Sequence, residues 1–150
     1  MLTFYIKHVS TGRFLHLQPK SNQNDNTKIV FCDEIQIDCK FTFEPVDGAW
    51  GYLKHVDSGK YIQPYGGNEK PENFTKLVIH EEASPASLFA IDQINNWLIH
   101  KDRKYVHPFS CRHTPEENTP LALHDEVHDN MTFVIVSPDD TNQQVFPKWA

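Results

Sequence analysis

Short apolar segments alternate with polar turns along the whole chain. The apolar segments are rich in aromatic and branched residues, and the stretches between them are rich in Gly, Pro, Asn and Asp. Short runs of this kind, bounded by turn residues, are typical of β-strands. No stretch keeps a helical period over several turns. The pattern therefore predicts an all-β protein.

The strand segments recur in the same order three times. In each copy a first strand is followed by a second strand that ends at His16, Gln63 or His107. The second strands are predicted at 13–15, 60–62 and 104–106, the third at 28–31, 76–79 and 121–123, and the fourth at 41–43, 88–91 and 133–136. The repeats cover about 1–47, 48–93 and 94–138, and a short C-terminal tail follows.

A unit of four short strands exposes an apolar face and cannot fold alone. Three such units closing around a pseudo-threefold axis bury that face and leave few strand edges. Propeller blades are the other repeat of this period, but propellers typically use about four to eight blades. We therefore predict a single β-trefoil domain over 1–150, with twelve strands in three four-stranded pseudo-repeats.

Composition narrows the classes of partner. With 39% hydrophobic and 23% charged residues the chain is globular,. A net charge of −6, without any Lys/Arg cluster, argues against a nucleic-acid partner,. No apolar run is long enough for a transmembrane helix, so we expect no membrane insertion,. The N-terminus MLTFYIKHVS has no signal-peptide core, but a trimmed precursor would show none either, so the compartment is left open,.

The cysteines indicate neither a disulfide framework nor a zinc motif. Cys32, Cys39 and Cys111 are odd in number, and no C-x-x-C pair occurs,. We expect three free thiols, although Cys32 and Cys39 could pair if two strands bring them together.

The third repeat carries the densest group of polar residues. It contains His107-Pro108 and the segment His124-Asp125-Glu126-Val127-His128. Alternate side chains of an extended segment share a face, so His124, Glu126 and His128 are predicted to point the same way. With His107 across the loop they predict a compact polar pocket. The equivalent residues are Cys32, Glu34 and Gln36 in repeat one, and His80, Glu82 and Ser84 in repeat two.

Three chemistries could use such a pocket. A metal site is disfavoured because neither other repeat keeps two histidines, so no metal or other cofactor is expected. Catalysis is disfavoured because no nucleophile with an adjacent base stands out. Sugar recognition fits best, since a carboxylate can accept from two adjacent hydroxyls and an imidazole both donates and accepts. The remaining interpretation is that these polar residues only cap turns.

Four motifs carry a resemblance to a known family. They are Lys54–Lys60, Pro64–Gly67, His107-Pro108 and His124–His128. The sequence resembles the galactose/GalNAc-specific β-trefoil lectins of marine mussels, the MytiLec and CGL type. Their repeats read roughly K-H-x-x-S-G-K, H-P-x-G-G, N-x-T and V-x-H-x-D-x-H. The resemblance runs from Phe4 to Pro138.

The resemblance implies a function and a set of residues. In that family the first His, the first Gly, the Asp and the final His hold a galactose-type sugar. It therefore implies a non-catalytic lectin for galactose- or GalNAc-containing glycans on cell-surface glycolipids or glycoproteins. The implied sugar-binding residues are His107, Pro108, Ser110, Asn118, His124, Glu126 and His128 in repeat three, His16, Glu34 and Gln36 in repeat one, and Gly66 and Glu82 in repeat two.

The three repeats depart from the family pattern to different extents. Repeat three keeps all three histidines but has Ser110 at the first Gly position, and repeat one has Gln36 at the last His. Repeat two has Gln63 and Ser84 in place of two sugar-binding histidines. Glu stands at the Asp position in every repeat. We expect fewer than three working sites, with repeat three ranked first and repeat two last.

Two further expectations concern protein partners. The loss of Gly and His from repeats one and two favours an alternative, a trefoil that has become a protein-interaction module. Some mussel lectins of this type dimerise through paired aromatic residues before the third repeat. Here that turn, Gln93–Trp97, lacks the pair, so a homodimer would need a different interface through Ile94 and Trp97.

Overall fold

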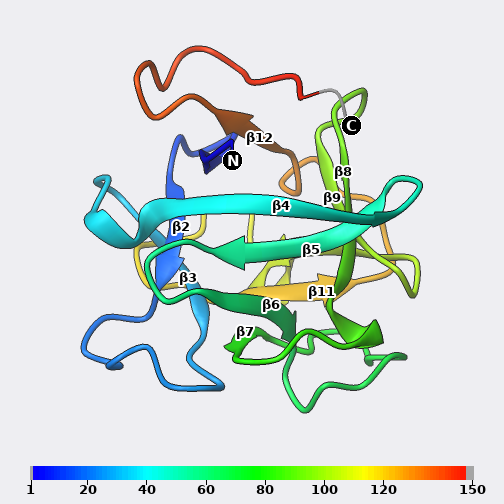
Figure 1. Cartoon of the computed structure of the whole chain (residues 1–150). Coiled ribbons are helices and arrows are strands. Elements are labelled where there is room, and N and C mark those ends of the chain that lie inside the picture. Colours follow the sequence, from blue (N-terminus) through cyan, green and yellow to red (C-terminus); the bar gives the residue numbers. More distant parts are fainter. Residues whose placement is uncertain (1, 148–150) are drawn as a thin grey trace.

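The computed structural model describes residues 2–147 and contains twelve strands in one antiparallel network (Figure 1). Unit one holds β1 (Phe4–His8), β2 (Phe14–Leu17), β3 (Ile29–Cys32) and β4 (Lys40–Asp47); unit two holds β5 (Trp50–His55), β6 (Lys60–Pro64), β7 (Leu77–His80) and β8 (Leu88–Asp92); unit three holds β9 (Trp97–His100), β10 (Lys104–Pro108), β11 (Leu121–His124) and β12 (Phe133–Val136). The twelve strands predicted from the repeat are confirmed. Short 3₁₀ turns lie at η1 (Ile37–Cys39), η2 (Pro85–Ser87) and η3 (Phe109–Cys111).

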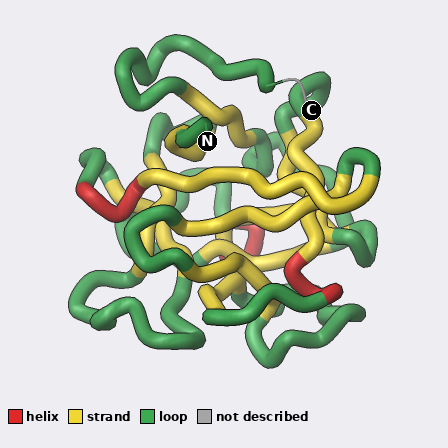
Figure 2. The backbone as a smooth tube through the Cα atoms, in the orientation of Figure 1, coloured by secondary structure: helices red, strands yellow, loops and turns green. Residues whose placement is uncertain are grey.

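The strands divide into a barrel and three hairpins, as in a β-trefoil. The first and fourth strands of the units pair in the order β12-β1-β4-β5-β8-β9. The second and third strands form the hairpins β2–β3, β6–β7 and β10–β11. Isolated bridges between Lys28 and Val78, Val30 and Pro120, and Lys76 and Ala122 join the hairpins to one another. Figure 2 shows the strands at the centre and the long loops around them.

One apolar core lies inside this arrangement. Every unit contributes aromatic and aliphatic side chains that are almost fully buried, because alternate residues of each strand face inward,. The largest are Phe4, Phe31, Phe41, Phe89, Ile6, Leu17, Ile29, Leu53, Ile79, Leu121, Leu123 and Met131. Within residues 2–147 no helix is long and apolar enough to cross a membrane.

The three cysteines are unpaired. Cys32 and Cys39 are both buried, and their sulfur atoms lie 3.6 Å apart in a small second cluster with Tyr5, Phe14 and Val136. Cys111 is half-buried beside the unit-three pocket.

A buried histidine ends the first strand of each unit. His8, His55 and His100 are inaccessible to solvent. Because a carbonyl oxygen only accepts, Nε2–H of each ring is the donor in a bond to the loop just before a fourth strand. The bonds are His8 to Asn130 O at 2.6 Å, His55 to Asp38 O at 2.7 Å and His100 to Ala86 O at 2.9 Å. Each bond fastens the loop of one unit to the first strand of the next.

Burial also fixes the charge of these three rings. Desolvation lowers the pKa of His8, His55 and His100 below the usual value of 6.5, and the hydrogen bond to the carbonyl offsets only part of that shift,. Each ring packs against a phenylalanine: Phe133 at 5.1 Å, Phe41 at 5.3 Å and Phe89 at 5.2 Å between centroids, respectively. The fold therefore requires all three imidazoles to be neutral.

Acidification is expected to destabilise the fold through these rings. The unfolded chain takes up protons near pH 6.5, whereas the folded chain does so only at lower pH, so stability is complete above that value and lost as pH falls below it. Each ring that stays neutral removes about 1.4 kcal/mol of unfolding free energy per pH unit. Urea unfolding at about pH 7.5, 6 and 5 measures the slope. His100→Gln should reduce this slope of unfolding free energy against pH by the contribution of one proton. Equal stability at all three pH values would contradict the prediction.

Candidate carbohydrate-binding site

Four side chains of unit three meet at one surface. His107 stands on β10 and His124 ends β11, while Glu126 and His128 lie on the loop that follows. The ring centroids of the three histidines are 5.5–5.9 Å apart in every pairing. Nε2 of His128 lies 3.3 Å from Oε2 of Glu126, which is exposed. The residues predicted to share a face are thus brought together around His107.

Hydrogen bonds to the backbone assign the tautomers of two rings. Nε2–H of His107 donates to the carbonyl oxygen of Glu126 at 2.8 Å, which leaves Nδ1 as an acceptor,. Nδ1 of His124 accepts from the Glu126 N–H at 3.0 Å, which leaves Nε2–H as a donor. The pocket therefore presents one acceptor, one donor and a carboxylate.

The acceptor atom of His107 has no partner. Its Nδ1 is buried and makes no hydrogen bond with the protein. Burial is the main reason that the pKa of His107 is lowered to about 4, and nearby His124 and His128 lower it further. The ring is therefore neutral at pH 7 and keeps its lone pair. A buried polar atom left unsatisfied marks a place for a ligand hydroxyl or an ordered water.

A turn beside this pocket has the same left-handed backbone in units two and three. Gly66 and Gly67 adopt φ values of 85° and 67°, and Ser110 and Cys111 adopt 62° and 53° at the equivalent positions. Left-handed backbone is costly for residues other than glycine. In unit three the turn is secured by Asn130, whose side-chain N–H donates to the carbonyl oxygen of Cys111 at 2.6 Å.

In unit one, the imidazole of the pocket contacts an acidic side chain. Nδ1 of His16 lies 3.3 Å from a carboxylate oxygen of Asp38 on η1, and its Nε2 is buried without a partner. Glu34 and Gln36 are exposed on the intervening loop. A hollow of about 520 Å³ remains, and it is lined in part by Lys20, Gln36 and Asp38. The imidazole is thus held by the protein's own carboxylate.

Unit two keeps a hollow without a second imidazole. The hollow measures about 390 Å³ and its lining includes Gln63, Gly66, His80 and Glu82. Asn26 also lines it, although this residue belongs to unit one. The unit-two pocket is therefore built from two units.

The same backbone hydrogen bond across a unit boundary occurs three times. In each unit, the residue directly before the threonine that precedes the third strand donates its backbone N–H to a carbonyl oxygen of the next unit. The bonds are Asn26 N to Ile79 O at 2.9 Å, Phe74 N to Leu123 O at 2.8 Å and Asn118 N to Phe31 O at 2.8 Å. Asn118, which the sequence groups with repeat three, thus lies beside unit one. Phe74 of unit two takes the corresponding place beside His124, a relation that spacing within one repeat does not reveal.

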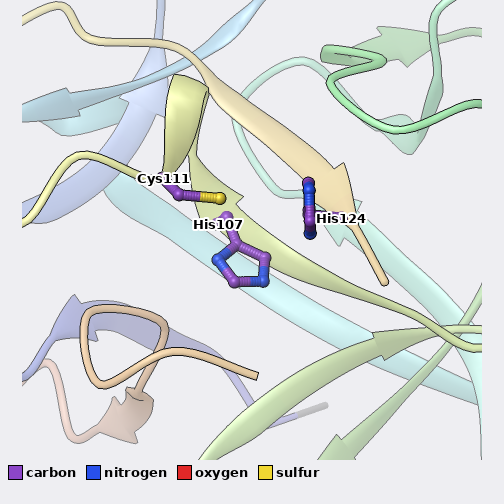
Figure 3. A group of neighbouring side chains, drawn as sticks. All are labelled: His107, Cys111 and His124. Atoms are coloured by element: carbon purple, nitrogen blue, oxygen red, sulfur yellow. The ribbon is translucent and has the colours of Figure 1, made fainter. Parts of the chain in front are cut away.

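Two groups of side chains in unit three could also hold a metal ion. They are His107 with Cys111 and His124, and His124 with Glu126 and His128, each with ligand atoms within 4.8 Å of one another. Figure 3 shows the first group, in which the Cys111 sulfur and the two imidazoles lie close together. The sequence-based expectation that the chain binds no metal stays a prediction.

Comparison with known proteins places the chain. A family model described as "MytiLec: Alpha-D-galactose-binding lectin" matches residues 4–138. The chain belongs to this lectin family. The resemblance stated from the sequence motifs is thereby confirmed.

Individual members of the lectin family match over shorter stretches. The chain is 44% identical over 54 residues to a galactose-binding lectin of Crenomytilus grayanus, an alignment covering 35% of this chain and 36% of that protein. It is 43% identical over 56 residues to an alpha-D-galactose-binding lectin of Mytilus galloprovincialis, covering 35% and 29% of the two chains. These alignments span only about a third of each relative.

Solved structures confirm the β-trefoil fold of this lectin-family chain. The designed three-fold symmetric protein ThreeFoil superposes with a TM-score of 0.76 at 10% identity, covering 90% of this chain and 98% of its own. The Rhizoctonia solani agglutinin gives 0.74 at 20% identity, covering 90% and 94%. SeviL bound to asialo-GM1 saccharide gives 0.65 at 10% identity, covering 91% and 97%. At these identities the likeness concerns the fold.

The strained turn of the lectin-family chain gives a paired prediction. Ser110→Gly should raise the unfolding free energy by about 1 kcal/mol, because it relieves a left-handed serine. Gly66→Ser should lower it by a similar amount through the same strain, since no atom lies within 4 Å of the added Cβ,. Denaturant unfolding of both variants checks the pair. Changes of the same sign would contradict the shared-turn interpretation.

Proposed function

We propose that the chain is a non-catalytic lectin that binds galactose- or GalNAc-terminated glycans of cell-surface glycoconjugates, chiefly through unit three. The observation that carries this proposal is the complementary set of groups around His107. It offers a neutral acceptor, a fixed imidazole donor on His124 and the exposed carboxylate of Glu126. Membership of the galactose-binding lectin family supports the same class of ligand.

This set of groups suits a sugar edge with neighbouring hydroxyls. One hydroxyl can donate to Nδ1 of His107 and satisfy the buried atom, while another accepts from Nε2–H of His124. The Glu126 carboxylate can accept from two adjacent hydroxyls in charge-assisted bonds, with His128 at 3.3 Å holding its position,. None of these contacts requires a bond to break or a metal to bind, so the proposal is recognition without catalysis.

The other two pockets lack parts of this set. In unit one the carboxylate of Asp38 already contacts the ring of His16. In unit two the amide of Gln63 stands where His107 stands, and Ser84 replaces His128. We therefore expect one principal site per chain, which limits the gain from multivalency within a single domain.

A homodimer belongs to the proposal as the assembly that would restore multivalency. Ile94, in the turn between β8 and β9, is 93% exposed to solvent and would supply an apolar contact. Two copies joined there would present two unit-three pockets.

Calorimetric titration of a galactose-terminated oligosaccharide tests the proposal directly. The wild type should bind with a stoichiometry near one, and His128→Ala should weaken binding by about tenfold or more, because Glu126 loses the imidazole that lies 3.3 Å from its carboxylate,. Gln36→Ala, the matched change in unit one, should leave affinity and stoichiometry unaltered. Absence of heat with every galactoside would contradict the proposal and favour the protein-interaction alternative.

Protonation of His107 should not weaken sugar binding in mild acid. With its pKa lowered to about 4, this ring remains an acceptor at about pH 5,. If the unit-three pocket depends on that acceptor, the His107 contact is lost only as pH approaches 4. Affinity measured at about pH 7, 5 and 4 on protein shown to be folded checks this. A His107→Asn variant with unchanged affinity at pH 7 would contradict the role of this acceptor.

A further inference from the structure

One residue of unit two differs in kind from its counterparts in the other units. Asn26, Phe74 and Asn118 occupy the same turn, with φ values of 70°, 70° and 69°. The next residue in each case is a threonine, and Thr27 and Thr75 bond back to the carbonyl oxygen three residues earlier at 2.6 and 2.7 Å. The backbone is thus alike in the three units, while the side chain is an amide in two and an aromatic ring in one.

The fold gains little from this phenylalanine. Asn tolerates left-handed backbone well, whereas a bulky residue at positive φ is an outlier. Phe74 is also 47% exposed, so the free energy gained by burying its ring offsets only part of the free-energy cost of the left-handed backbone,. Strained residues that folding does not explain gather at ligand sites. The aromatic ring at this position therefore calls for a role in binding.

Phe74 lies at the edge of the unit-three pocket. Its ring centroid is 5.0 Å from that of His124 and 6.4 Å from that of Phe109. The loop that carries it is fixed to unit three by Asn73, whose side chain donates to Asp125 Oδ1 at 3.2 Å and accepts from Asp125 N at 3.1 Å. The ring is therefore held in register with the polar groups.

Beyond His124 the surface becomes apolar and hollow. A depression of about 620 Å³ is lined by Tyr65, Phe74, Phe109, Lys76 and neighbouring residues. Lys76 Nζ sits 4.7 Å from the Phe109 ring centroid, which keeps that ring in place,. Phe74 thus contacts His124 of the unit-three pocket and also lines this aromatic depression.

We propose that Phe74, with Phe109, forms a second subsite that takes the apolar face of the second pyranose ring of a galactose-terminated glycan. This inference rests on the proposed function, in which the terminal sugar is held by His107, His124 and Glu126. A pyranose ring has an apolar face of C–H groups that packs on aromatic rings, and such side chains line sites beside a few directing polar groups. Phe74 then determines which glycans are bound rather than whether galactose is bound.

The test compares a monosaccharide with disaccharides on matched proteins. The probes are methyl α-galactoside and a panel of lactose, N-acetyllactosamine and galactosyl-galactose. The variant is Phe74→Asn, which installs the residue that the other two units carry, and the control is Val46→Asn, which removes a similarly exposed apolar side chain from β4. Affinities are measured by calorimetry and unfolding midpoints by urea.

We expect the wild type and Val46→Asn to bind at least one disaccharide about three- to tenfold more tightly than methyl α-galactoside. Phe74→Asn should lose this preference, while its affinity for methyl α-galactoside stays within about twofold. Its unfolding midpoint should equal or exceed that of the wild type, because the strain is relieved.

Several results would overturn the inference while leaving the proposed function intact. They are binding of methyl α-galactoside with no preference for any disaccharide, an equal loss of both ligands in Phe74→Asn, or a lower unfolding midpoint in that variant. If methyl α-galactoside and all disaccharides fail to bind the wild type, the proposed function itself is overturned.

Discussion

The bond from a buried, neutral imidazole to a backbone carbonyl holds each part of this trefoil together. These imidazoles belong to His8, His55 and His100 at the ends of the first strands. They donate hydrogen bonds to carbonyl oxygens of the loops that precede the fourth strands. Those loops also carry the residues of the three pockets. The same hydrogen bond therefore joins neighbouring units and fixes each pocket loop to the barrel. A charged ring could not occupy this apolar position without a large desolvation penalty, so the core and the pockets share one electrostatic requirement.

Because these contacts are repeated, the three units can diverge in their pockets without losing the backbone that supports them. The loop after the third strand keeps one hydrogen-bond pattern with different partners: Gln36 N to Cys39 Sγ, Ser84 N to the Ser87 hydroxyl, and His128 N to Met131 Sδ. Sulfur and hydroxyl serve the same geometric purpose. In the pocket above, an imidazole contacts an acid in unit one, an amide replaces it in unit two, and only unit three gathers three imidazoles.

The sequence predicted the elements that local spacing determines. Period-two alternation placed His124, Glu126 and His128 on one face, and the threefold repeat indicated a trefoil. Spacing did not predict contacts across unit boundaries, so it counted Asn118 with repeat three and overlooked Phe74. The missing information is the packing of one unit's loop on the next unit's third strand, which depends on closure of the whole barrel. An alignment of the three repeats would have identified Phe74, because it is an aromatic residue at a left-handed turn where the other two repeats have an amide.

Divergence of the pockets changes how such a domain can achieve selectivity. Three equal sites gain strength by avidity and tolerate weak individual contacts. A chain with one principal site has to distinguish glycans through the contacts of that site alone. An extended surface suits this demand, because each added contact on a preorganised platform raises affinity without a new binding event. In the proposed binding mode the composite construction supplies such a surface: unit three would provide the hydroxyl-binding groups, while unit two would provide Phe74 on a loop fixed by Asn73. A repeat whose own pocket lacks the second imidazole can thus still contribute a side chain to the neighbouring proposed site.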